Sequence, residues 1–178
     1  MNAIRRKTMV KFCLAMGLFI LAGVFRQLDQ DIPPLAKQAE KRRFSAPSLA
    51  CALLKATPAG LMGDLETLGF LFEALCERDL RIYAESFGAN LYHYQDYKNQ
   101  EIDAVIELPD GQWCAFEIKL GANQIDAAAA NLLEIKKQIE ADPKGKPPAV
   151  LCVLCGMANA AYQRPDGVFV VPVTALKE

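Results

Sequence analysis

The sequence predicts an α/β domain with a mixed sheet flanked by helices, and three observations support this. Apolar residues recur at three- and four-residue steps over residues 64–79 and again over 123–139, as expected of amphipathic helices. Short apolar or alternating segments lie between and after these two stretches and are typical of strands. A hydrophobic fraction of 52% over 178 residues supplies the core of one globular domain and argues against disorder.

The first helix begins at Asp64, a plausible N-cap, and its apolar stripe runs to Asp79. Strands are expected at 81–87, 91–96, 102–108 and 113–120, and together they indicate a meander. Asn123 is the expected N-cap of the second helix, with Asp126 three positions on. After a loop rich in proline and lysine, two buried strands are expected at 149–154 and 168–173.

The chain divides into three parts. Residues 1–30 are a hydrophobic segment in which Arg5, Arg6 and Lys7 precede an apolar run over 12–25. That run is shorter than the ~20 residues that span a bilayer, and no convincing cleavage site follows it. We favour a buried helix or a remnant of a longer chain over a signal peptide or membrane anchor. Residues 31–62, punctuated by proline, form a linker with short helices, and residues 63–178 form the main domain.

Charge and cysteine content limit which kinds of binding site the chain can carry. Twenty basic residues oppose twenty-one acidic ones, so no field of the whole protein attracts a polyanion. Nucleic-acid binding would therefore need a local basic patch. Clusters of this kind are usually solvated surface. The two candidate patches are Lys41, Arg42 and Arg43, or Lys136, Lys137, Lys144 and Lys146. The six cysteines lie mostly in apolar runs and are expected to be reduced. Cys152 and Cys155 should point to opposite faces of a strand, which disfavours a zinc or redox pair.

The turn at Pro109, Asp110 and Gly111 sets the register of a hairpin. Proline suits the first corner of a type I turn and glycine the left-handed position that follows it, which gives a three-residue loop with a bulge. Leu108 then faces Gln112. The further pairs that follow are Glu107 with Trp113, Val105 with Ala115, Asp103 with Glu117 and Glu101 with Lys119. The opposite face is wholly apolar and is expected to cover the core; it carries Ile102, Ala104, Ile106, Leu108, Cys114, Phe116, Ile118 and Leu120.

Two carboxylates that face one another repel unless a positive charge compensates them. Asp103 and Glu117 are the oxygen ligands that Mg²⁺ prefers, and a divalent cation is the compensator that we expect. Lys119, two residues further on the same face, could hold the attacking water or stabilise charge on a phosphate. The chemistry indicated is phosphodiester hydrolysis. The competing interpretation is a solvated hairpin face, which commonly carries Asp, Glu and Lys.

These residues resemble the PD-(D/E)XK, or restriction-endonuclease-like, superfamily, whose α-β-β-β-α-β core carries an acidic residue on one hairpin strand and Glu-x-Lys on the next. Asp103, Glu117 and Lys119 match that triad, and Glu73 matches an acidic residue of the first helix. The resemblance implies that Asp103 and Glu117 bind Mg²⁺ or Mn²⁺ together with a main-chain carbonyl near Ile118. Glu66 shares a helix face with Glu73 and is an alternative partner. For His93, the single histidine, we expect a structural surface role rather than catalysis.

A closer resemblance covers Arg43 to Ala175. The strings Arg43–Ala50, Leu68–Glu73, Arg78–Tyr83 and Glu101–Glu107 are similar to the C-terminal domain of unknown function of bacterial and archaeal AAA-type ATPases. No Gly-rich phosphate loop occurs here, so the ATPase would be a separate module. The resemblance implies a cytoplasmic, DNA-associated, metal-dependent nuclease-like domain. The alternative is a catalytically inactive module of the same fold that binds DNA or protein, and a membrane-tethered protein is a third possibility.

Overall fold

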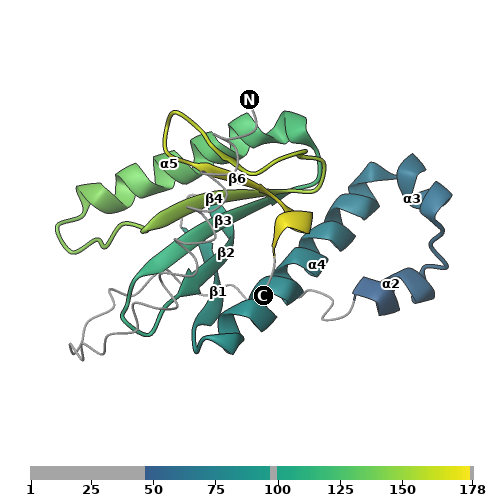
Figure 1. Ribbon diagram of the computed structural model, residues 1–178, viewed down its shortest axis with the longest axis horizontal. Coiled ribbons are helices and arrows are strands. Elements are labelled where there is room, and N and C mark those ends of the chain that lie inside the picture. The colour runs from purple at the N-terminus through teal and green to yellow at the C-terminus, as the bar shows by residue number, and fades with distance from the viewer. Residues whose placement is uncertain (1–46, 97–99, 177–178) are drawn as a thin grey trace.

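A computed structural model describes residues 47–96 and 100–176 of the chain. Its centre is a six-stranded mixed sheet in the order β1-β2-β3-β4-β6-β5, with helix α4 on one face and helix α5 on the other (Figure 1). The strands are β1 Asn90–Gln95, β2 Glu101–Glu107, β3 Trp113–Lys119, β4 Val150–Cys155, β5 Tyr162–Gln163 and β6 Phe169–Pro172. The first three are antiparallel, β3, β4 and β6 are parallel, and β5 is antiparallel to β6. The α/β class is therefore confirmed, and so is the meander for three of its four predicted strands.

Helix α4, Leu65–Ser86, is longer than predicted. Its N-cap is Asp64 as expected, since the side chain accepts a hydrogen bond from the backbone N–H of Thr67 at 3.1 Å. The strand predicted at 81–87 is wrong, because the helix continues through it. Cys76, Leu80 and Ala84, at four-residue steps, are all buried against the sheet, while the β-branched Ile82 faces outward. Packing of that helical face outweighs the local strand propensity.

The hairpin between β2 and β3 has the predicted turn. Gly111 has φ +76°. The N–H of Leu108 donates to the carbonyl of Gln112 at 2.8 Å, and the carbonyl of Leu108 accepts from the N–H of Gly111 at 2.9 Å. The pairs Glu107 with Trp113 and Val105 with Ala115 follow in the predicted register. The chemistry of the turn therefore sets the register of both strands.

A bulge in β2 changes the predicted faces. Tyr92 pairs with Val105 and Tyr94 with Ile102, so β2 holds one residue more than β1 over this stretch. Ile102 consequently joins the core under α5 rather than the face with Ala104, which corrects the prediction. The other face of the hairpin is also buried, because α5 covers Val105, Trp113 and Ala115.

Helix α5, Ile125–Ala141, follows a short 3₁₀ turn η1, Ala122–Gln124. Asn123 was the predicted N-cap, but the helix begins two residues later without a side-chain cap. Instead the Gln124 side chain accepts from the backbone N–H of Gly121 at 3.1 Å. The predicted apolar stripe is present, and its buried members pack on β3 and β4: Ile125, Ala128, Ala129, Leu132 and Ile135.

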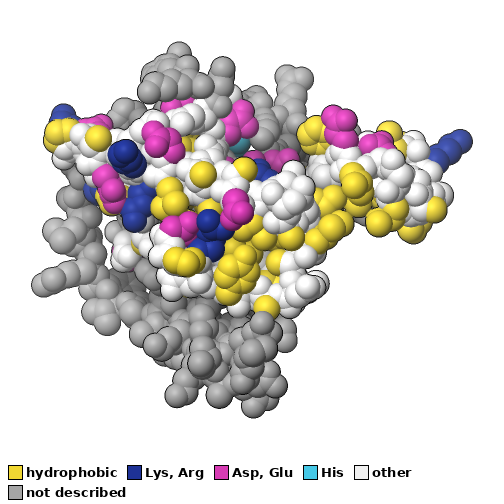
Figure 2. All heavy atoms as spheres, turned by 90° about the horizontal axis from the view of Figure 1, so that it is seen from above, with side chains coloured by type: hydrophobic (Ala, Val, Ile, Leu, Met, Phe, Trp, Pro, Cys, Tyr) yellow, Lys and Arg dark blue, Asp and Glu magenta, His cyan; other side chains and the backbone are white. Residues whose placement is uncertain are grey.

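A helical arm projects beyond the sheet and consists of α2, Pro47–Leu53, α3, Pro58–Gly63, and the first turns of α4 (Figure 1). These short helices lie in the stretch predicted to be a linker. Apolar side chains gather along the arm and where it meets the body (Figure 2). Its large exposed residues are Leu49, Leu53, Leu54, Met62, Leu65 and Phe70, each 55% to 70% exposed. A patch of this kind on a monomer is typical of a protein contact surface.

The cysteines and the N-terminal segment complete the comparison. The five cysteines of the described part of the chain are free thiols, as expected, and Cys13 lies outside it. Cys152 and Cys155 belong to the two opposite cores, in agreement with their predicted orientations. The apolar run over 12–25 and the basic cluster over 41–43 lie outside the described residues. Within the described ranges, no helix is both long and apolar enough to cross a membrane.

Candidate functional site

The candidate site forms where β2 and β3 separate. Their paired residues end at Ala104 with Phe116, so Asp103 and Glu117 lie just past the last pair. In a regular ladder the N–H of Ile118 would bond to the carbonyl of Ile102. It donates instead to Oδ2 of Asp103 at 2.9 Å. The aspartate therefore replaces a backbone acceptor, and its carboxylate is held in the opening between the strands.

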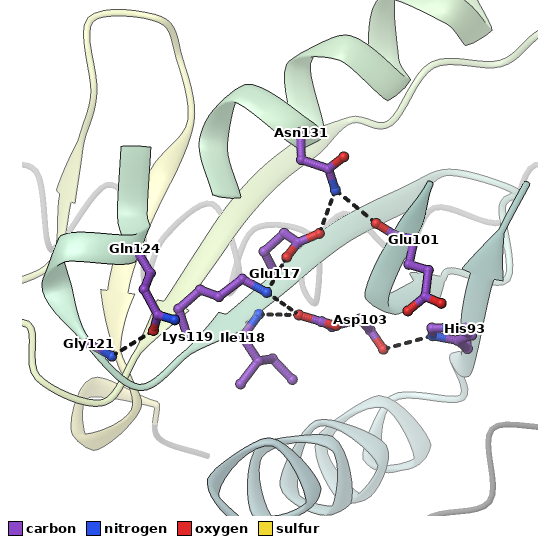
Figure 3. A network of polar contacts seen from close by, with 9 residues as sticks. All are labelled: His93, Glu101, Asp103, Glu117, Ile118, Lys119, Gly121, Gln124 and Asn131. Atoms are coloured by element: carbon purple, nitrogen blue, oxygen red, sulfur yellow. Dashed lines mark hydrogen bonds and ion pairs between the residues drawn. The ribbon is translucent and has the colours of Figure 1, made fainter. Parts of the chain in front are cut away.

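Lys119 joins the two predicted carboxylates (Figure 3). Its Nζ lies 3.0 Å from Oδ2 of Asp103 and 2.6 Å from Oε2 of Glu117. The two acids are only 8% and 4% exposed, so their charges are largely removed from water. The structure thus brings together all three residues of the predicted triad, and the compensating positive charge comes from the chain itself.

The environment separates the acidities of the two carboxyl groups. Burial raises the pKa of Glu117, the charge of Asp103 raises it further, and the result is about 7 despite the opposing effects of Lys119 and Asn131. Burial also acts to raise the pKa of Asp103. The charge of Lys119 and hydrogen bonds from Ile118, Lys119 and Glu73 outweigh it, and the pKa falls below its usual value. Asp103 is therefore the permanent anion of the pair.

The ammonium group is stabilised in the same way. Burial alone would lower the pKa of Lys119, but the charges of Asp103 and Glu117 outweigh burial and raise it. The lysine therefore stays protonated throughout the physiological range. Such a side chain can donate hydrogen bonds or neutralise an anion, but it is a poor base while both acids surround it.

Glu73, the fourth predicted site residue, also reaches this point. It lies on α4, is half-buried, and is close enough to the Asp103 side chain to help lower the pKa of that carboxyl. Phe72 beside it lies close to Gly156, which follows β4. The middle of α4 therefore passes under this end of the sheet. The alternative, Glu66, is exposed in the first turn of α4.

Two further residues that contact the site were not assigned to it by sequence reasoning. Asn131 of α5 donates to Oε1 of Glu117 at 2.8 Å. Nδ1 of His93 lies 3.4 Å from the carbonyl oxygen of Asp103, at the bulge of β2. The sequence held one signal for Asn131, a polar residue three positions after Ala128 and four before Ile135 on an otherwise apolar stripe.

The loop part of the predicted lysine cluster, Lys144 and Lys146, lies away from the site. The carbonyl of Lys146 accepts a hydrogen bond from the indole N–H of Trp113 at 2.8 Å. Trp113 begins β3, whereas Lys119 ends it, so this contact lies at the opposite end of the strand from the site. The loop that carries Lys144 and Lys146 therefore does not border the carboxylates.

The donor set suits a hard cation bound by few protein ligands. Among the residues described, no group of three or more His, Cys, Asp or Glu side chains is arranged to hold a metal ion. Asp103 and Glu117 nevertheless direct one oxygen each at a single point, the Nζ of Lys119. Mg²⁺ is often held by one or two carboxylates and keeps several waters, so the pair fits this ion if the ammonium moves aside.

A family of domains of unknown function, DUF4143, matches residues 68–176. The chain belongs to the DUF4143 family. The match covers more than half of the chain and includes α4 from its second turn, the whole sheet and α5. The DUF4143 family is associated with AAA-type ATPases, in agreement with the resemblance found in the sequence. No curated protein and no solved structure matches the chain.

Proposed function

We propose that this DUF4143 domain is a metal-dependent nuclease of the PD-(D/E)XK type that hydrolyses phosphodiester bonds of DNA. One observation carries the proposal, the contact of the Lys119 ammonium with both buried carboxylates at 3.0 and 2.6 Å. A purely structural surface hairpin has no reason to bury two acids and a lysine together, because the desolvation is costly. Buried ionisable groups with perturbed pKa values cluster at functional sites.

Asp103 and Glu117 are the proposed ligands of Mg²⁺ or Mn²⁺, with a main-chain carbonyl near Ile118 as a further ligand. When bound, the cation would supply Lewis acidity toward a phosphoryl oxygen and acidify a coordinated water. Asp103 is the better of the two ligands for the cation, since its lowered pKa keeps the carboxylate ionised. Glu117 must lose its proton, and its carboxylate is then held by Asn131.

Lys119 has two successive roles in this proposal. Without a divalent cation it neutralises the acids. With a cation held by Asp103 and Glu117, the ammonium of the flexible Lys119 side chain would be free to donate to the attacking water or to the phosphate, whose developing charge it would stabilise. Glu73 supports Asp103 from α4, since it helps to keep the pKa of that carboxyl low.

The test is cleavage of linear, single-stranded and branched DNA by the full chain with Mg²⁺ or Mn²⁺. Asp103→Asn and Lys119→Met should each lower the rate by at least about 100-fold, in the range of a lost acid, base or electrostatic group. Glu107→Gln is the matched control, because Glu107 lies at the other end of β2. Cleavage that persists in Asp103→Asn, or that EDTA leaves unchanged, would contradict the proposal.

The second candidate is an inactive module of the same fold that binds a protein, and the exposed apolar arm favours it. The arm presents six large apolar side chains with few charges, as protein interfaces do at their centre. An AAA-type ATPase in the cytoplasm is the proposed partner, from the family association. Calorimetry separates the candidates. A chain that takes up no divalent ion at millimolar concentration, yet binds the ATPase through Leu53 and Phe70, is the inactive module.

A further inference from the structure

Asn131 is the polar member of the α5 face that packs on the sheet. Ala128, Leu132 and Ile135 around it are buried in the core between α5 and the strands. A polar side chain in such a position loses hydration and needs partners in the protein. The partners of Asn131 are both at the candidate site.

The amide of Asn131 spans the opening between the two strands (Figure 3). Its Nδ2 donates to Oε1 of Glu117 at 2.8 Å and to the carbonyl oxygen of Glu101 at 2.9 Å. An amide nitrogen carries two protons, and each has one acceptor here. The carbonyl of Glu101 can only accept, and so can Glu117 when it is ionised, so the nitrogen is the atom that faces them. One side chain therefore links the start of β2 and the end of β3 where their ladder has ended.

This linkage determines which oxygen of Glu117 faces the site. Oε1 is taken by Asn131, and Oε2 is the oxygen that contacts Lys119. A carboxylate held at both oxygens cannot rotate freely about its terminal bond. The hydrogen bond from Asn131 to Oε1 does not depend on Lys119, so it would hold Oε2 toward Asp103 if the ammonium moved away.

We propose that Asn131 is a positioning residue that presents Oε2 of Glu117 to the divalent cation. This inference rests on the proposed function, because it concerns the same site. Groups that orient a metal ligand commonly contribute 10- to 100-fold to metal affinity. Asn131 acts through Glu117 and does not itself touch the substrate or the cation.

The test is Mn²⁺ binding to the full chain, followed by the paramagnetic signal of free Mn²⁺. Asn131→Ala and the bulkier Asn131→Leu should each weaken binding about 10-fold or more. Gln138→Ala is the matched control, because Gln138 lies on α5 and its amide bonds only the exposed Glu134. The control should stay within twofold of the parent. Equal affinity in parent and Asn131 variants would overturn the inference.

A double-mutant cycle of thermal unfolding tests the contact between Asn131 and Glu117 without metal. It distinguishes failure of the positioning role from failure of the proposed nuclease function. Asn131→Ala and Glu117→Ala, alone and combined in EDTA, should be non-additive by about 3 °C, since each removes the partner of the other. Additive shifts overturn the positioning role whatever the metal does. Non-additive shifts in a chain that binds no Mn²⁺ support the contact and reject the nuclease proposal. Mn²⁺ binding with additive shifts leaves the nuclease proposal standing without Asn131.

Discussion

Replacing Lys119 by methionine should destabilise the metal-free protein and make its stability depend on divalent cations. Methionine keeps the length and apolar stem of lysine but removes the charge that both acids contact. Loss of one partner of a fully buried ion pair costs about 3 to 5 kcal/mol. The Lys119 side chain is 27% exposed, which allows water to screen part of that loss. We therefore expect a decrease of about 2 to 3 kcal/mol in the free energy of unfolding at pH 8.

The size of this decrease should depend on pH and on Mg²⁺. Glu117, whose pKa is already about 7, can take up a proton once the lysine is gone, so the loss should shrink toward pH 6. Mg²⁺ at about 100 times its dissociation constant should return about 2.7 kcal/mol to the variant. The parent should gain less, because its ammonium competes with the ion.

The assay is urea unfolding followed by the fluorescence of Trp113, the single tryptophan, which is buried. Lys136→Met is the matched control, since its exposed pair with Glu140 at 3.7 Å should contribute only about 0.3 to 0.5 kcal/mol. The reasoning fails if Lys119→Met is as stable as the parent at pH 8 in EDTA. It also fails if Mg²⁺ stabilises both proteins equally.

Three other predictions follow from the same structure. The pKa of Glu117 is raised in the fold from 4.5 to about 7, so the folded state holds its proton more tightly than the unfolded chain. Stability in EDTA should therefore fall by about 3 kcal/mol as the pH rises from 4.5 to 7, and Glu117→Gln should remove that decline in urea titrations. Gly111→Ala should cost about 1 to 2 kcal/mol because φ is +76°, whereas Gly69→Ala, inside α4 with open space around its Cβ, should add about 0.5 to 1 kcal/mol. Thermal melts that show the same sign for both glycines would contradict this. Leu132→Ala, at 1% exposure, should cost about 2 to 5 kcal/mol in the same melts, and a loss below 1 kcal/mol would mean that α5 does not pack as described.

Most patterns that act over a few residues were predicted correctly from the sequence, the N-cap at Asn123 excepted. The turn at residues 109–111 requires proline and glycine for its backbone angles, so its type and register follow from the residues of the turn alone. The cap at Asp64 and the stripe of α5 are equally local. The strand predicted at residues 81–87 was wrong because of a non-local effect. Burial of Leu80 and Ala84 against the sheet outweighed the strand propensity of the segment and kept it helical.

Most residues of the candidate site could also be predicted from the sequence, but the geometry of the site could not. The register brought Asp103 toward Glu117 and put Lys119 on the same face, and the resemblance added Glu73. The bulge in β2 could not be predicted, since it depends on how β1 pairs with β2. Asn131 was missed because only the packing of α5 brings its amide to the end of β3.

By itself, the sequence determined the α/β class, the hairpin and the presence of two acids and a lysine on it, because turn preferences and side-chain alternation act between neighbours along the chain. Only the tertiary structure decided that the lysine ammonium lies between the acids and that an amide of α5 holds one of them. These contacts join residues from three elements, β2, β3 and α5, and their energies depend on burial that no local segment can produce.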